Sequence, residues 1–353
     1  ITNAVTFQNT GTLNLGNAAG DTLTFNGGLT ESTSGTVTLS GSIVSSNDAI
    51  NFAAITLGTD TTITSAGGSI VTGNITGTSG QDITITSTGG STNTALINGT
   101  IGAGGNINTI AVTGTSGLQF AGNITTNNAA GNTFTATGST IDTNGITIDT
   151  NNTNNDGNIT LNVDTFTESV TMDAGTAGVI QMTPVTTDAV IEAARTNSGN
   201  ISEDVFYDID LVQVTSAAHV LIGSGSHTGN IFWGNDSAAL VMPDGSNVVL
   251  QNSSSGQILL SSDYTSENGF LTLTSGNGVT LQDLSNNVIA TINLGSGALT
   301  VTGAATLADA SINITATGGI SFSSTIDADN ASSNDRTLTL NSGTGNTISV
   351  AGN

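Results

Sequence analysis

Short segments in which an aliphatic, a polar and a second aliphatic residue alternate recur along the chain. Examples are Leu13–Leu15, Ile83–Ile85, Ile146–Ile148 and Leu338–Leu340. Strict alternation places both aliphatic side chains on one face of an extended strand and the polar side chain on the other. A strand this short is not stable alone, so the fold must pack many such strands against one another.

The segments recur about every 20 residues, with three segments in each step. In the N-terminal third, the aliphatic series are Leu23, Ile43, Ile63, Ile83; Leu29, Ile50, Ile70; and Ile55, Ile75. In the C-terminal third, we assign Leu271, Ile292, Ile312; Val279, Leu299, Ile320, Leu338; and Val288, Leu307, Ile326, Ile348. This pattern predicts an all-β parallel β-helix (β-solenoid) with three short strands per coil and roughly 17 coils. We expect a right-handed coil, as crossover connections generally are.

Glycine and proline usage agrees with this fold. The chain has 46 Gly and only 2 Pro, and corners need residues that tolerate positive φ, whereas proline removes a donor from the strand ladder. The alternative is a row of antiparallel sandwiches, such as immunoglobulin-like modules of about 100 residues with larger, aromatic-bearing cores. An aromatic content of 4% and the short period favour the solenoid.

Three regions follow from the pattern. We expect regular β-solenoid over 1–165 and 271–353, and irregular coils or a small inserted β region over 166–270. The middle region holds the only Trp, both Tyr, both His, both Pro and all three Met. Because aromatic residues and Met are enriched at protein interfaces, Tyr207, Phe232 and Trp233 are predicted contact residues.

Terminal coils of a solenoid normally carry a polar cap, but the segments near Ile1 and Val350 are apolar. Open strand edges template pairing with another chain. Ile1 and Val350 are therefore predicted interface residues, and we expect either end-to-end self-association or continuation in a longer polypeptide.

The net charge of the chain excludes some classes of binding partner. The formal net charge is −24, with no Lys or Cys and only Arg195 and Arg336 as strong cations. Binding to nucleic acid or to an anionic membrane surface needs clustered cations, so neither is expected. No apolar run reaches about 18 residues, so we expect no membrane insertion. The polar, lysine-free composition indicates an extracellular protein.

Two segments in particular resemble a known group of proteins. They are 145–164, GITIDTNNTNNDGNITLNVD, and 319–330, GISFSSTIDADN. In composition and period they resemble the large β-strand-repeat surface proteins of bacteria, which include filamentous-haemagglutinin-type adhesins, autotransporter passengers and surface-layer proteins. The resemblance implies an extracellular β-helical shaft with an adhesive, matrix or coat function. The Asn-Pro-bearing secretion domain of the haemagglutinin type is absent from these residues.

Catalysis is not expected. Some β-helices cleave polysaccharides, and hydrolases among them need two carboxylates about 5–9 Å apart. Asp208 and Asp210 form the nearest pair, which we interpret as a solvated acidic edge. His219 and His227 are interpreted as outward loop residues, because no Ser or Cys stands in a recognisable arrangement with them. The sequence therefore predicts a protein that is not an enzyme and requires no cofactor.

Calcium is the one ligand that the residue types favour, because hard oxygen ligands are abundant and the chain repels itself electrostatically. Asn152, Asn154 and Asp156 have the spacing that opens a calcium loop, although Val163 stands where such a loop needs a bidentate Glu. Asp327 and Asp329 belong to a second acidic loop. These five residues are candidate Ca²⁺ ligands, with Asx-rich turns as the alternative interpretation.

Three functions remain open at this point. The first is a protomer or segment of a surface filament, sheath or coat, and the second is an adhesin shaft that binds a host surface or a glycan. The third is ice binding, suggested by Thr-x-Thr pairs such as Thr84/Thr86 and Thr133/Thr135. In the predicted C-terminal ladder the outward pairs are Thr280/Gln282, Thr300/Thr302, Ser321/Ser323 and Thr339/Asn341, and this interruption disfavours ice binding.

Eight Asn-x-Ser/Thr sequons also occur, which matter for function only if the host glycosylates its surface proteins. Their positions are Asn74, Asn98, Asn123, Asn158, Asn200, Asn235, Asn313 and Asn330. In a chain so rich in Asn and Thr, we interpret them as chance occurrences.

Overall fold

The computed structural model confirms the predicted fold class. It describes residues 1–31, 35–88, 94–127, 130–151, 155–166, 169–193, 204–207, 212–233, 240–241, 247–261, 263–266, 268–281, 291–308, 311–328 and 336–352. These residues form a parallel β-solenoid of about 12 turns and contain no helix. The chain divides into two compact units, Ile1–Ile180 with Leu211–Ser216 (unit 1) and Gln181–Asp210 with Ala217–Asn353 (unit 2).

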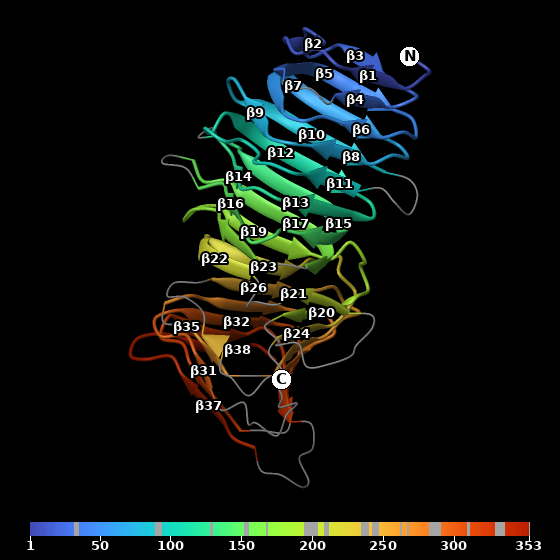
Figure 1. Ribbon diagram of the computed structural model, residues 1–353. Coiled ribbons are helices and arrows are strands. Elements are labelled where there is room, and N and C mark those ends of the chain that lie inside the picture. The colour runs from blue at the N-terminus through green and yellow to red at the C-terminus, as the bar shows by residue number, and fades with distance from the viewer. Residues whose placement is uncertain are drawn as a thin grey trace. The chain divides into compact units, whose positions relative to one another are not determined.

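Unit 1 has three ladders of parallel strands, which we call faces 1, 2 and 3, and the long strands turn a corner and serve two of them (Figure 1). Face 1 contains β2 (Leu13–Leu15), β5 (Val37–Ser45), β7 (Ile55–Ser65), β9 (Ile75–Gly77), β14 (Ile124–Thr125), β16 (Ile146–Asp149), β18 (Val170–Asp173) and β22 (Val212–Ser216). Face 2 contains β3 (Thr22–Thr24), β5, β7, β10 (Gln81–Ser87), β12 (Ile107–Gly114), β15 (Thr133–Asp142) and β17 (Asn158–Phe166). Face 3 contains β1 (Val5–Phe7), β4 (Leu29–Glu31), β6 (Ile50–Asn51), β8 (Ile70–Thr72), β11 (Thr94–Ile97), β13 (Gly117–Phe120) and the ends of β15 and β17.

Unit 2 also has three ladders, faces 4, 5 and 6. Face 4 contains β19 (Val179–Thr183, of which the first two residues belong to unit 1), β23 (His219–Gly223), β26 (Val248–Gln251), β29 (Leu271–Thr274), β32 (Ala298–Thr302), β35 (Gly319–Phe322) and β38 (Ile348–Val350). Face 5 contains β21 (Asp204–Tyr207), β20 (Val190–Ala193), β24 (Ile231–Trp233), β27 (Ile258–Leu260), β30 (Val279–Leu281), β33 (Ala305–Leu307) and β36 (Ile326–Ala328). Face 6 contains β25 (Leu240–Val241), β28 (Tyr264–Thr265), β31 (Thr291–Asn293), β34 (Ile312–Thr315) and β37 (Leu338–Asn341).

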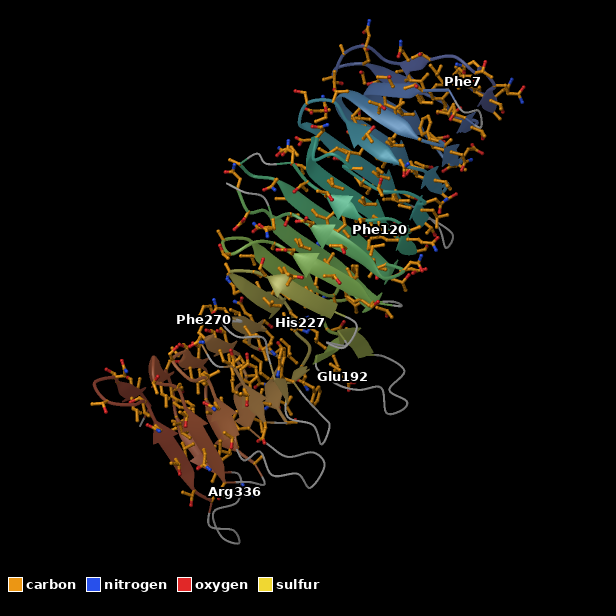
Figure 2. The ribbon with its side chains drawn as sticks, turned by 60° about the vertical axis from the view of Figure 1, so that its left-hand side comes forward. Phe7, Phe120, Glu192, His227, Phe270 and Arg336 are labelled. Atoms are coloured by element: carbon orange, nitrogen blue, oxygen red, sulfur yellow. The ribbon has the colours of Figure 1, made fainter. Side chains whose placement is uncertain are left out.

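Inward aliphatic side chains stack along each ladder and form the core. On face 2, Ile43, Ile63 and Ile85 lie in register on successive strands and are fully buried. The polar residue between each pair of aliphatic residues points away from the core, as the two-residue period of a strand requires. Phe120 and Phe134 of unit 1 add an edge-to-face aromatic pair with ring centroids 5.7 Å apart; Phe120 is labelled in Figure 2.

A ladder of buried serines closes one corner of unit 1. Ser45, Ser65 and Ser87 end the face 2 segments of β5, β7 and β10 and are almost inaccessible to solvent. The hydroxyls of Ser45 and Ser65 both donate to the carbonyl of Asp48, at 2.7 and 3.0 Å, and Ser87 donates to the carbonyl of Gly68 at 2.8 Å. These bonds satisfy corner carbonyls that the strand ladders leave unpaired.

The predicted register is correct in part of unit 1. Leu29 pairs with Ile50 and Ile50 with Ile70, and Leu23, Ile43 and Ile63 also stack as expected. Ile63, however, pairs with Ile85 and not with Ile83, because this coil is longer than the assumed period.

Of the C-terminal series, only the step from Leu299 to Ile320 is correct. Leu271 pairs with Leu299, Val279 with Ala305, and Ile292 with Ile314. Coil length varies along the chain: hydrogen bonds between neighbouring coils join residues 20 positions apart at Thr56 and Thr76, but 28 apart at Asp263 and Thr291. Longer coils also explain why there are about 12 turns and not the predicted 17 or so.

The middle of the chain contains solenoid strands together with a long excursion. Within unit 2, the hydroxyl of Thr183 donates to the carbonyl of Gly223, which lies 40 residues later on the next strand of face 4. On face 5, β20 pairs with β24 along one edge and with β21 along the other, so the excursion supplies an additional parallel strand.

Candidate functional site

The structure describes two of the five candidate calcium ligands; Asn152, Asn154 and Asp329 lie outside the described residues. The carboxylate of Asp156 accepts a hydrogen bond from the backbone N–H of Ala177 in the next coil at 2.8 Å. Asp327 is exposed on β36, and its carboxylate accepts the N–H of Ala328 at 2.8 Å. Within the described part of the chain, no group of three or more His, Asp or Glu side chains could hold a metal ion. Calcium binding stays a prediction.

The predicted interface residues divide into buried and exposed ones. Trp233 was a wrong choice, because its side chain is 1% exposed in the core of unit 2, with its ring centroid 6.1 Å from that of Tyr264. Phe232, the preceding residue, points the other way and is half-buried. Tyr207 ends β21, and its side chain lies outside what the structure describes. Ile1 and Val350 are 67% and 46% exposed, so both side chains are accessible to a partner.

The two histidines are not equivalent. His219 begins β23, is half-buried, and lies with its ring centroid 6.4 Å from that of Phe270. His227, labelled in Figure 2, lies in the turn between β23 and β24 and is 1% exposed, which corrects the interpretation as an outward residue. Burial lowers the pKa of His227, and the negative charge of Asp188 opposes this shift. The predicted acidic pair, Asp208 and Asp210, lies outside the described residues.

A carboxylate pair lies at the end of two neighbouring face 1 strands. Asp149 of β16 is in register with Asp173 of β18. Burial raises the pKa of Asp149; its hydrogen bond from the N–H of Asn151 opposes the shift, and the charge of Asp173 adds to it. Asp173 accepts hydrogen bonds from the N–H of Gly175 at 3.1 Å and from the hydroxyl of Ser216. Both carboxylates therefore act as turn-forming acceptors.

The most regular surface feature is an array of threonines on face 2, which the sequence reasoning missed. Thr62 and Thr64 of β7 lie in register with Thr84 and Thr86 of β10, and all four side chains point outward. Farther along the ladder, Thr135 and Thr137 of β15 continue the two columns. The signal was present as Thr-x-Thr pairs: Thr84/Thr86 lies in these columns, whereas Thr133/Thr135 is displaced from them by two residues.

No family model matches the sequence, and no curated protein or solved structure is significantly similar to it. The geometry alone therefore defines the class, which is a parallel β-solenoid repeat protein. No helix of the described residues has the length and hydropathy to cross a membrane.

Proposed function

We propose that the chain is an extracellular structural protein, a protomer or segment of a surface filament, sheath or coat, and that it has no catalytic role. The observation that best supports this proposal is the dense bonding between successive coils. Backbone ladders on three faces in each unit enclose an aliphatic core, and side chains add further bonds from coil to coil. A body bonded in this way resists bending and stretching, which is the mechanical property that a fibre or coat needs.

Asparagine and aspartate side chains supply much of this additional bonding. The Oδ1 atom of Asn123 accepts the N–H of Thr147 at 3.0 Å, and that of Asn247 accepts the N–H of Phe270 at 3.0 Å. The carboxylate of Asp82 accepts the N–H of Thr109 at 2.9 Å. In each case the acceptor lies one coil before the donor, so the bond runs along the stacking direction.

The strands at the two ends offer edges for assembly. Ile348 and Val350 of β38 are 42% and 46% exposed, although they alternate with Ser349 as inward residues do elsewhere. Their counterparts one coil earlier, Ile320 and Phe322, are buried. Because exposed strand edges with apolar side chains pair readily with another strand, we propose that a further coil stacks on this edge, supplied by a second copy end to end or by a longer polypeptide.

The test is electron microscopy of purified residues 1–353 over a range of concentrations. We expect filaments that lengthen with concentration, and we expect the double variant Ile348→Lys, Val350→Lys to shorten them at least tenfold, because two charges cannot enter an apolar junction without a large cost. Val185→Lys is the matched control, since Val185 is 47% exposed but lies away from the end strands. Monomers at every concentration, or equal effects of both substitutions, would refute end-to-end stacking.

One observation favours the adhesin alternative. On the outward side of face 5, Phe232 lies in register with Leu259, and both side chains are half-buried. Threonines fill most such outward positions on faces 1 and 2 of unit 1, whereas face 3 has the aliphatic pair Val71 and Leu96 in register. An adhesin would use this apolar pair to bind a glycan or host surface saturably, and a glycan array probed with the intact chain distinguishes that role from a purely mechanical one.

A further inference from the structure

Face 2 of unit 1 carries two parallel columns of outward side chains that cross seven strands, from β3 to β17. The first column is Thr22, Ser42, Thr62, Thr84, Ala111, Thr135 and Thr160. The second is Thr24, Val44, Thr64, Thr86, Thr113, Thr137 and Asn162. Threonine fills most positions of both columns, so this face repeats one chemical pattern in two directions.

The spacing of the array is set by the β-structure. Neighbouring parallel strands lie about 4.8 Å apart, and residues i and i+2 of one strand about 6.6 Å apart. The pairing from Ser42 through Thr62, Thr84 and onward to Thr160 has no register shift within these columns. Each hydroxyl is therefore one point of a near-rectangular lattice.

Most hydroxyls of this array are available to an outside partner, although that of Thr137 accepts a hydrogen bond from the Nδ2 atom of Asn162, its neighbour in the second column, at 3.3 Å. Among the described residues, the hydroxyls of Thr62, Thr64, Thr84, Thr86 and Thr113 form no hydrogen bond with the protein. Threonines of face 1 behave differently: the hydroxyls of Thr56 and Thr76 bond to each other at 3.2 Å, and Thr76 also donates to the carbonyl of Ile55 at 3.3 Å. Most threonine hydroxyls of the array therefore do not bond one coil of the protein to the next.

The charge of the face restricts the partner further. The chain as a whole carries −24, yet neither column contains an ionisable residue. Carboxylates flank the columns: Asp21 directly precedes Thr22, and Asp164 stands two positions after Asn162. Asp60 and Asp82 stand two positions before the first column, and each accepts a backbone N–H of the next coil, at 3.0 and 2.9 Å. Neither column has an aromatic side chain, the group that would lie flat against an apolar ring face. The surface fits a partner that is uncharged, polar and periodic.

We propose that face 2 of unit 1 binds ice. The oxygen atoms in a prism plane of hexagonal ice repeat in two perpendicular directions at distances close to both spacings of the array. Hydroxyls on such a lattice can take the places of ice water molecules, and the threonine methyl groups between them exclude water that does not fit. A solenoid face is already rigid, so little conformational entropy is lost when many weak contacts form at once.

This inference reverses the expectation from the sequence, which rested on a C-terminal ladder that the structure does not contain. Leu299 and Ile320 are neighbours on face 4, whereas Val279 belongs to face 5 and Leu338 to face 6. Ice binding is independent of filament formation, since the array lies on a lateral face and the proposed junction lies at the end strands.

The test measures inhibition of ice recrystallisation and thermal hysteresis with the intact chain. We expect both activities, and we expect the variant Thr86→Tyr, Thr113→Tyr to need at least tenfold more protein for the same inhibition, because two bulky rings on adjacent strands lift the face off the ice. The matched control is Thr147→Tyr, Thr171→Tyr, a pair equally adjacent in register but on face 1 of the same unit. This control should retain the wild-type activity.

Circular dichroism and the midpoint of thermal unfolding check that each variant folds. If the tyrosine pair unfolds the unit, Thr86→Val, Thr113→Val keeps the side-chain shape without the hydroxyls and should still weaken inhibition several-fold. Wild-type protein that leaves ice growth unchanged overturns the proposal, as does equal loss in the array variant and the face 1 control. Binding to crystalline cellulose or chitin without an effect on ice would also overturn it in favour of a polysaccharide.

Discussion

Buried polar residues influence the stability of unit 2, and His227 is the clearest case. Its N–H donates to the carbonyl of Ser224 at 3.0 Å, and its own carbonyl accepts the N–H of Ser253 at 2.7 Å. The ring is buried, and neither ring nitrogen has a hydrogen-bond partner among the residues that the structure describes. The backbone of His227 thus joins two coils, while burial of its side chain disfavours the protonated, charged imidazole.

This environment predicts a pH-dependent stability. The folded-state pKa of His227 lies below its ordinary value of 6.5, so the unfolded chain binds the extra proton more readily. The stability that the neutral ring contributes is present above pH 6.5 and is lost as the pH falls below it. We expect the midpoint of thermal unfolding to drop between pH 8 and pH 5, and to drop less in His227→Leu.

The control for this prediction is His219→Leu, which should keep the wild-type pH dependence. If the midpoint of thermal unfolding falls by the same amount from pH 8 to pH 5 in the wild type and in His227→Leu, His227 does not cause the loss of stability in acid.

Among the elements, the start of a strand has a recurring structure. An Asn or Asp precedes the first inward apolar residue, and its Oδ1 accepts an N–H from the next coil: Asn123 from Thr147, Asn158 from Val179, and Asp263 from Thr291. Asn74 does the same with the N–H of Thr100 at 2.9 Å. Asn74, Asn123 and Asn158 each open an Asn-Ile-Thr sequon, so these three sequons reflect strand starts and not chance.

The contribution of this bond can be measured. We expect Asn123→Ala to lower the free energy of unfolding by about 0.5–1.5 kcal/mol, since the bond is solvent-accessible and only its net contribution is lost. Chemical denaturation gives the value. Asn98→Ala is the control: Asn98 also opens a sequon, but its exposed side chain makes no hydrogen bond within the described structure. Similar losses in both variants would argue against a special role for the strand-start asparagine.

For the whole molecule, the dominant long-range force is self-repulsion. A charge of −24 with almost no cations to offset it opposes a compact state. Screening lengths fall from about 30 Å at 0.01 M salt to about 8 Å at 0.15 M. We therefore expect the midpoint of thermal unfolding to rise over this range of sodium chloride, and a flat response would contradict the importance of self-repulsion.

The same measurement tests calcium. At matched ionic strength, calcium chloride should stabilise the chain more than magnesium chloride only if specific oxygen sites exist, and a chelator should then remove the excess. Equal effects of the two salts would leave screening as the whole explanation and would remove Asp156 and Asp327 as calcium ligands.

Local pattern was enough to predict the strands, because a two-residue period and corner-forming Gly and Asn act within a few residues. It assigned the all-β class, the inward residues and the stacking of Leu29, Ile50 and Ile70. It also identified Ile1 and Val350 as apolar residues near the ends, and both are exposed.

Which strands become neighbours was decided only in three dimensions. Coil length varies with loops that carry no periodic signal, so Ile63 meets Ile85, and Leu271 meets Leu299. Which threonines lie in one column of face 2 depends on this strand register, so the array could not be predicted from the sequence. The burial of Trp233 and His227 likewise depends on coils that are distant in sequence. The periodicity of the sequence indicates whether a side chain points inward or outward. Which side chains become its neighbours depends on the length and path of every loop between the strands.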